Sequence, residues 1–225
     1  MFITLEGIEG SGKTTQIEHI SRFLQSYGID LTVTREPGGT GIGKKIRAIL
    51  LDPQSTEMDP STEMLLYTAD RAQHIRQIIL PALKAEKVVL CDRYFDATLV
   101  YQGYARGLDI PSIRQLHGLM CDGLMPELTL LFDLSPEEGL SRAWKQIHNG
   151  ERTGNEARFE KEAVDFHRKV RQGYLELARS EPDRFEIIDA ARAEESVRDQ
   201  IFSVLARRLL EATEYSVKKV NKKTI

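Results

Sequence analysis

A nine-residue stretch near the start of the chain has residue types and a spacing suited to binding phosphate groups. Gly7, Gly12, Lys13 and Thr14 fit the pattern G-x-x-x-x-G-K-[ST]. Glycines let backbone N–H groups turn toward phosphate oxygens. The lysine can reach the β- and γ-phosphates of a nucleotide, and the threonine hydroxyl can ligate Mg²⁺. The predicted nucleotide-phosphate site consists of Gly7, Ile8, Glu9, Gly10, Ser11, Gly12, Lys13, Thr14 and Thr15.

A second candidate for metal chemistry follows an apolar run later in the chain. Residues 88–91 are continuously apolar, as in a fully buried parallel strand, and Asp92-Arg93-Tyr94 comes next. Proteins with a phosphate loop of this kind hold Mg²⁺ with an acidic residue at such a strand end. Asp92 therefore joins Thr14 as a predicted metal ligand.

Other charged and aromatic residues allow two interpretations. Arg35, after a predicted strand, is either a solvated surface charge or a bidentate clamp on a phosphate. Tyr67 and Arg71 lie four residues apart and share one helix face. They form either a half-buried surface pair or a face that recognises a base by ring stacking and guanidinium donation. The sequence alone leaves both questions open.

The elements that must position these residues alternate between strands and helices. Short apolar runs predict five strands, at 1–5, 30–34, 88–91, 128–134 and 185–188, with helical periodicity in the segments that follow them. This order, with right-handed crossovers, predicts an α/β fold: a five-stranded parallel sheet flanked by helices, of the P-loop NTPase type. We expect one domain over residues 1–212.

Two polar segments fall outside this regular pattern. Residues 148–158 are polar, contain glycine and lie between two helices, so they form either a mobile lid or an ordinary surface loop. The basic segment 213–225 is expected to be a frayed tail.

Composition narrows the class of protein. With 225 residues and 41% hydrophobic residues the chain can build a full core, and its net charge of −3 argues against a nucleic-acid partner. There is no signal-peptide pattern and no apolar run of membrane-spanning length, so we expect a cytoplasmic protein without a membrane partner. Cys91 and Cys121 lack metal or redox spacing and are expected to be buried thiols in a reducing compartment.

Taken together, the motifs resemble those of the bacterial thymidylate kinases. The resemblance covers nearly the whole chain and rests on residues 2–3, 5–15, 34–40, 65–74, 92–94, 101–103 and 174–178. It implies a nucleoside monophosphate kinase fold with a short lid, and transfer of the γ-phosphoryl group of ATP to dTMP. The implied products are ADP and dTDP, and dTDP is used in dTTP synthesis. It also implies Mg²⁺ as a cofactor and a homodimer.

The resemblance assigns roles residue by residue. Glu9 contacts the deoxyribose 3′-hydroxyl, Tyr67 stacks on thymine, and Arg71 bonds to the base. Arg142 packs against adenine. The implied acceptor site comprises Glu9, Arg35, Pro37, Arg47, Tyr67, Arg71, Arg93, Thr98, Tyr101 and Gln102. The implied catalytic set comprises Lys13, Asp92, Arg93, Arg152 and Arg158.

Three positions bear on this assignment. Gly10 occupies the place where the eukaryotic enzymes have an arginine, so the resemblance moves that charge to the lid, to Arg152 or Arg158. Ala157 stands where the family often has aspartate, and Ala97 replaces a hydroxyl near the acceptor. These departures affect rate and acceptor affinity rather than the class of reaction.

Other functions fit parts of the pattern. The chain could phosphorylate another deoxynucleoside monophosphate, act as a nucleotide-operated binding switch, or be a non-catalytic relative. No GTPase-type guanine motif is present, which disfavours a switch. The retained Lys13, Asp92 and Arg93 disfavour a non-catalytic relative.

Overall fold

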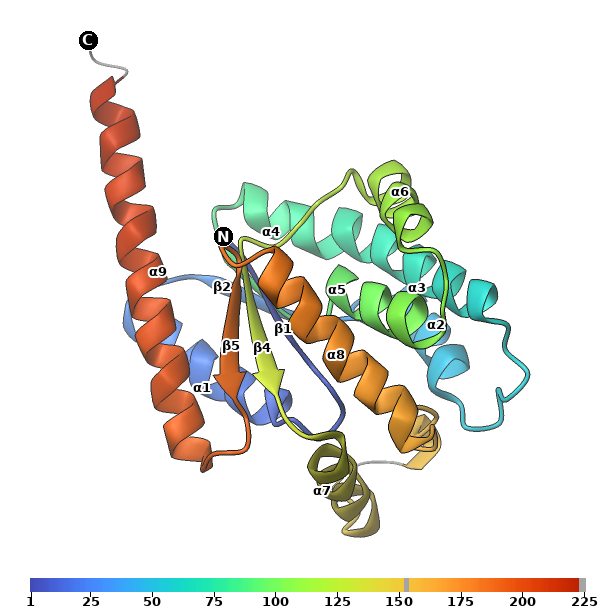
Figure 1. Cartoon of the computed structure of the whole chain (residues 1–225). Helices are drawn as coiled ribbons and strands as arrows, with labels where there is room; N and C mark the ends of the chain where they lie inside the picture. Colours follow the sequence, from blue (N-terminus) through green and yellow to red (C-terminus); the bar gives the residue numbers. More distant parts are fainter. Residues whose placement is uncertain (152–153, 223–225) are drawn as a thin grey trace.

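A parallel sheet forms the centre of the molecule (Figure 1). The computed structural model describes residues 1–151 and 154–222, with side chains as far as residue 210. Within these residues, five strands pair in the order β2-β3-β1-β4-β5, all parallel. The strands are β1 (Phe2–Gly7), β2 (Leu31–Arg35), β3 (Val88–Asp92), β4 (Leu128–Asp133) and β5 (Phe185–Asp189). The predicted sheet is confirmed, with strand ends within two residues of those expected from the apolar runs.

Helices cover both faces of this sheet (Figure 1). One face packs against α1 (Lys13–Ser26) and α9 (Glu194–Lys222). The other packs against α4 (Leu80–Lys84), α5 (Phe95–Thr98) and α8 (Val164–Ser180). The remaining α-helices of the described chain are α2 (Gly41–Leu51), α3 (Pro60–His74), α6 (Ile110–Cys121) and α7 (Pro136–His148).

The core lies between the sheet and these two helix layers. Ile3, Leu5, Val89 and Leu90 are inaccessible to solvent, as expected for parallel strands covered on both faces. Both cysteines are buried free thiols, as predicted. The carboxyl ends of β1, β2 and β3 meet at one edge, where an open α/β sheet binds its ligands.

Local sequence signals explain where several helices begin. Asp59 caps α3 by accepting a hydrogen bond from the Ser61 N–H, and Pro60 stands at the first helical position. The helix then passes through a π-helical turn, Ile75–Ile79, into α4, where Pro81 lies in the first turn and needs no N–H partner. The helical backbone continues without a break past Pro81, and the kink or new turn expected there stays a prediction.

The C-terminal helix is the longest of the described chain. α9 continues to Lys222 and extends past the sheet (Figure 1), and the frayed tail expected over residues 213–225 stays a prediction. The sequence from 213 to 222 contains no glycine or proline that would end the helix. None of the helices in the described part of the chain combines the length and apolar character that crossing a membrane requires.

Candidate active site

The phosphate loop joins β1 to α1 at the carboxyl edge of the sheet. Gly12 caps α1 with φ of 88°, a left-handed conformation that favours glycine. Lys13 folds back over the loop, and its Nζ donates to the Gly7 carbonyl (3.1 Å), the Ile8 carbonyl (2.9 Å) and the Ser11 hydroxyl (3.1 Å). The lysine therefore braces the loop with the same ammonium group that is predicted to reach a nucleotide.

Gly10 makes the closest approach of the loop to another element. Its φ is 69°, and a Cβ built there would lie 2.1 Å from the Gly139 carbonyl oxygen in α7. The backbone of α7 thus leaves no room for a side chain at this position. An arginine inside the loop is excluded in this conformation, so any further cation must come from elsewhere.

A cavity of about 490 Å³ opens beside the loop. Most of the predicted site residues line it, including both proposed metal ligands: Glu9, Gly10, Ser11, Gly12, Lys13, Thr14, Thr15, Arg35, Pro37, Arg47, Tyr67, Arg71, Asp92, Arg93, Thr98, Tyr101 and Gln102. Because the loop and the arginines face one space, a nucleotide phosphate and a second anionic group can be held side by side there. Arg35, Tyr67 and Arg71 all lie at this cavity, which fits phosphate and base binding, and their roles stay predictions.

Arg93 and Glu9 form the charged centre of the cavity. Arg93 Nη2 lies 2.9 Å from Glu9 Oε1, which also accepts from the Tyr101 hydroxyl at 2.7 Å. His167 Nδ1 lies 3.2 Å from the other Glu9 oxygen. Burial alone would raise the pKa of Glu9, but Arg93 and His167 hold that pKa well below its usual range. Glu9 is therefore a buried carboxylate that stays charged and can accept a hydroxyl proton in a hydrogen bond.

Arg71 is held rigidly at the far wall. It is 2% exposed, its Nε donates to Glu36 Oε2 at 2.8 Å, and its Nη2 donates to the Thr98 hydroxyl at 2.8 Å. Nη2 also donates to the Tyr94 carbonyl at 3.2 Å. The adjoining Glu36–Pro37 peptide bond is cis. Such a fixed guanidinium can present donors to a flat ligand without moving.

Arg142 lies at a second cavity on the other side of the loop. This cavity, of about 430 Å³, is lined by Gly10, Gly12 and Thr15 as well as Arg142. Arg142 donates to the Ala190 carbonyl at 3.0 Å and to Glu138. The space continues from the loop toward α9, so a nucleotide with its phosphates on the loop can extend its base here.

The family model for thymidylate kinase matches residues 5–201, which include the loop, both cavities, the end of β1 and the other four strands. The chain belongs to the thymidylate kinase family. It therefore acts as an ATP-dependent phosphotransferase whose acceptor is dTMP, with dTDP and ADP as products.

The chain is similar to individual thymidylate kinases over almost their full lengths. The chain is 53% identical to one from Desulfosudis oleivorans, across 92% of this chain and 97% of that one. It is 56% identical to one from Desulforapulum autotrophicum, across 93% and 92%. The crystal structure of thymidylate kinase from Ehrlichia chaffeensis matches with a TM-score of 0.71 at 32% identity, across 91% and 98%.

The segment predicted to be a lid, residues 148–158, contacts α2 and α3 through Glu156 and Arg158. Glu156 accepts two hydrogen bonds from Arg47, at 3.0 and 2.7 Å, so an acidic lid residue is present beside Ala157. Arg158 does not line either cavity: it is 9% exposed, pairs with Glu63, and donates to the Leu50 carbonyl at 3.1 Å. Its position ties the lid to α2 and α3 and does not support the predicted catalytic role. Arg152 lies outside the described residues.

We expect Arg158→Ala to act mainly on stability. Removing Arg158 takes one cation from the buried Glu63, which should lower the free energy of unfolding by about 3 kcal/mol. Urea unfolding measures this, with Arg168→Ala as the control, because Arg168 is 58% exposed in its ion pairs and should change stability by less than about 1 kcal/mol. Unchanged stability together with a large fall in kcat would contradict this expectation and return Arg158 to the catalytic set.

Sequence reasoning missed the buried carboxylates that hold the arginines. Glu36 accepts a hydrogen bond from Arg71, and Glu63 accepts one from Arg158 and one from Gln102 at 2.7 Å. Sequence reasoning also missed His167, which faces Glu9. Glu6 is also buried, and burial together with the nearby Asp96 raises its pKa to about 7. One signal was available: Glu6 is a carboxylate near the end of a strand in which Thr4 is the other polar residue.

Proposed function

We propose that phosphoryl transfer from ATP to dTMP takes place in the 490 Å³ cavity, with the donor phosphates on the loop and the acceptor against Arg35, Arg71 and Arg93. The observation that carries this proposal is the shared cavity: loop and arginines line one space. ATP and dTMP phosphates repel each other, so the protein must align them and neutralise their charge. Lys13 and Arg93 bring fixed cations to the two sides of that space.

The adenosine part of ATP extends into the second cavity in this proposal, with Arg142 beside the base. Arg142 is held by Glu138 and the Ala190 carbonyl, so its guanidinium plane is fixed at the cavity wall. A fixed guanidinium plane can stack on an aromatic base.

Each residue around the acceptor has a proposed role in binding dTMP. Glu9 accepts the 3′-hydroxyl of the sugar, Tyr67 covers one face of thymine, and Arg71 donates to a carbonyl of the base. Arg35 and Arg93 bind the acceptor phosphate, and Arg47 assists from α2. Pro37, Thr98, Tyr101 and Gln102 complete the wall around the nucleotide. Arg152 is the lid arginine that we propose to act on the transferred group.

Mg²⁺ fits the residues present at the loop. The Asp92 Oδ1 atom is buried without a hydrogen-bond partner, and the Thr14 hydroxyl stands in the first turn of α1 on the same cavity. Mg²⁺ typically uses one or two protein ligands together with substrate phosphates. When bound, the ion would neutralise phosphate charge. The described residues contain no cluster of three or more His, Cys, Asp or Glu side chains suited to a metal.

We expect Asp92→Asn to weaken the Mg²⁺ dependence of the reaction. Loss of the carboxylate charge should raise the Mg²⁺ concentration that gives the half-maximal rate by roughly 10-fold, the usual size of effect when a metal site loses a supporting group. Rates measured over a Mg²⁺ titration test this. Asp165→Asn, on the exposed surface of α8, is the matched control. An unchanged midpoint in Asp92→Asn would remove Asp92 from the metal site.

A coupled assay of ADP release tests the proposed function as a whole. The enzyme is given ATP, Mg²⁺ and dTMP, and the same reaction is run without an acceptor. We expect ADP release to depend on dTMP. ADP release at the same rate without dTMP would indicate a nucleotide hydrolase rather than a kinase.

We also propose that the enzyme is a homodimer. Supporting this, Leu65 on α3 and Leu119 and Met120 on the contacting helix α6 are 54%, 67% and 48% exposed. Exposed apolar side chains on two neighbouring helices favour a protein interface. Sedimentation velocity would report the mass of two chains. The cytoplasmic location and the lack of a nucleic-acid partner or membrane partner stay predictions.

A further inference from the structure

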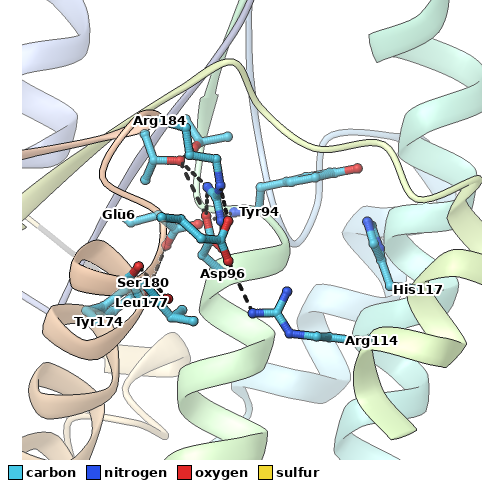
Figure 2. A network of polar contacts seen from close by, with 12 residues as sticks. Glu6, Tyr94, Asp96, Arg114, His117, Tyr174, Leu177, Ser180 and Arg184 are labelled. Atoms are coloured by element: carbon cyan, nitrogen blue, oxygen red, sulfur yellow. Dashed lines mark hydrogen bonds and ion pairs between the residues drawn. The ribbon is translucent and has the colours of Figure 1, made fainter. Parts of the chain in front are cut away.

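Glu6 is the last side chain of β1 before the phosphate loop, and it is completely buried. Its two oxygens accept one hydrogen bond each: Oε1 from the Tyr94 backbone N–H at 2.7 Å, and Oε2 from the Tyr174 hydroxyl at 2.6 Å (Figure 2). A buried carboxyl group is unfavourable unless hydrogen bonds satisfy it. Both of these hydrogen bonds lead to Arg93.

The first connection runs through the backbone on which Arg93 is carried. Arg93 has φ of 65°, in the left-handed region that residues other than glycine rarely adopt. Its own N–H donates to the Leu5 carbonyl at 3.0 Å, and the next N–H, that of Tyr94, donates to Glu6. Two successive residues of β1 therefore hold the peptide groups on both sides of Arg93.

The second connection runs through the Tyr174 hydroxyl in α8. This hydroxyl has a single hydrogen, which it donates to Glu6, so it presents its lone pairs elsewhere. Arg93 Nη1 lies 3.4 Å from the same oxygen. The Glu6 carboxylate thus orients the hydroxyl as an acceptor for Arg93, next to the Tyr101 hydroxyl at 3.0 Å from Nη1.

The other buried carboxylate of this network is already paired. Asp96 is inaccessible to solvent and accepts two hydrogen bonds from Arg184, both at 2.7 Å (Figure 2). The Arg184 guanidinium therefore balances the charge of Asp96. Glu6, by contrast, accepts hydrogen bonds from the backbone N–H that follows Arg93 and from the Tyr174 hydroxyl that lies near the Arg93 guanidinium.

We propose that Glu6 is a positioning residue for phosphoryl transfer, which fixes the backbone and guanidinium of Arg93 through Tyr94 and Tyr174. The proposal rests on the role given above to Arg93 at the acceptor phosphate. Phosphoryl transfer depends on alignment, and a displacement of about 1 Å can cost roughly 100-fold in rate. Glu6 lines neither cavity, so we expect its effect on the reaction to pass mainly through Arg93.

The test uses Glu6→Gln in the full-length enzyme. Glutamine keeps an oxygen for the Tyr94 N–H but turns an NH₂ donor toward Tyr174, which redirects the hydroxyl hydrogen toward Arg93. We expect kcat to fall about 10-fold, with the KM for ATP and for dTMP little changed. Tyr174→Phe, which removes only the second connection, should lower kcat in the same direction if Glu6→Gln does not fold.

Tyr94→Phe is the matched control. The Tyr94 hydroxyl is also buried but donates to the Leu124 carbonyl at 3.0 Å, so its removal leaves the Glu6 contact of the Tyr94 backbone in place. Its kcat should stay near wild type. If Glu6→Gln and Tyr174→Phe both match this control in kcat, the proposal is wrong.

An Arg93→Ala background separates positioning from general structural damage. If Glu6 acts through Arg93, Glu6→Gln should change kcat little once Arg93 is alanine. A further 10-fold loss in that background would overturn the positioning role while leaving Arg93 in the mechanism. Wild-type kcat in the Arg93→Ala enzyme itself would contradict the role of Arg93, and the proposal with it.

Discussion

Lys13→Ala should lower kcat by a factor of roughly 100 or more, because the transition state loses a preorganised cation. The ammonium group is held at the cavity by three acceptors of the loop, so it is in place before a nucleotide arrives. The pKa of Lys13 is lowered to about 8, and burial is the largest cause. An ammonium group removed from water in this way interacts more strongly with phosphate charge.

The measurement must separate catalysis from support of the loop. Lys13 also braces the Gly7 and Ile8 carbonyls, so its loss can loosen the loop and weaken ATP binding. Steady-state kcat is therefore measured at saturating ATP, together with thermal unfolding. Lys45→Ala, exposed on α2, controls for the loss of a positive charge elsewhere. Turnover within a few-fold of wild type in Lys13→Ala would remove Lys13 from the mechanism.

The parts of the fold that were predicted depend on local sequence. The strand at 88–91 was identified because an unbroken apolar run fits a strand buried on both faces. The phosphate loop was identified because Gly12, Lys13 and Thr14 must stand at a fixed spacing to bind phosphate. The order of strands and helices then limits the arrangement of a parallel sheet. These signals need no knowledge of distant contacts.

The partners of the buried charges could not be predicted in this way. Arg158 and Glu63 are 95 residues apart in sequence, and their pairing depends on how α3 and the lid pack. The sequence motif around Arg158 has the residue types of a catalytic lid, but in the structure this arginine binds Glu63, the Leu50 carbonyl at the end of α2 and the Ser55 carbonyl after that helix. Residue type is a local property, whereas the direction of a long side chain is decided by tertiary packing.

The acceptor preference is the second large effect that we expect. Arg71 donates from a fixed position, because Glu36 and Thr98 bind it and it is almost fully buried. Thymine offers carbonyl acceptors to such a donor, whereas cytosine would present an amino group. An unpaired buried donor costs about 1–3 kcal/mol, so dCMP should be a poor acceptor. Uracil lacks only the methyl group, a difference of about 1–3 kcal/mol in an apolar pocket, so dUMP should be weaker than dTMP.

Comparison of kcat/KM across dTMP, dUMP, dCMP and the purine deoxynucleoside monophosphates measures this preference. The purine monophosphates should be poor acceptors. Tyr67→Phe keeps the ring at the cavity wall and should preserve the order of acceptors, whereas Tyr67→Ala removes the surface that covers the base and should lower kcat/KM for dTMP. A preference for dCMP or a purine monophosphate over dTMP would contradict base recognition by Arg71 and Tyr67, while leaving the phosphate loop and Lys13 in their roles.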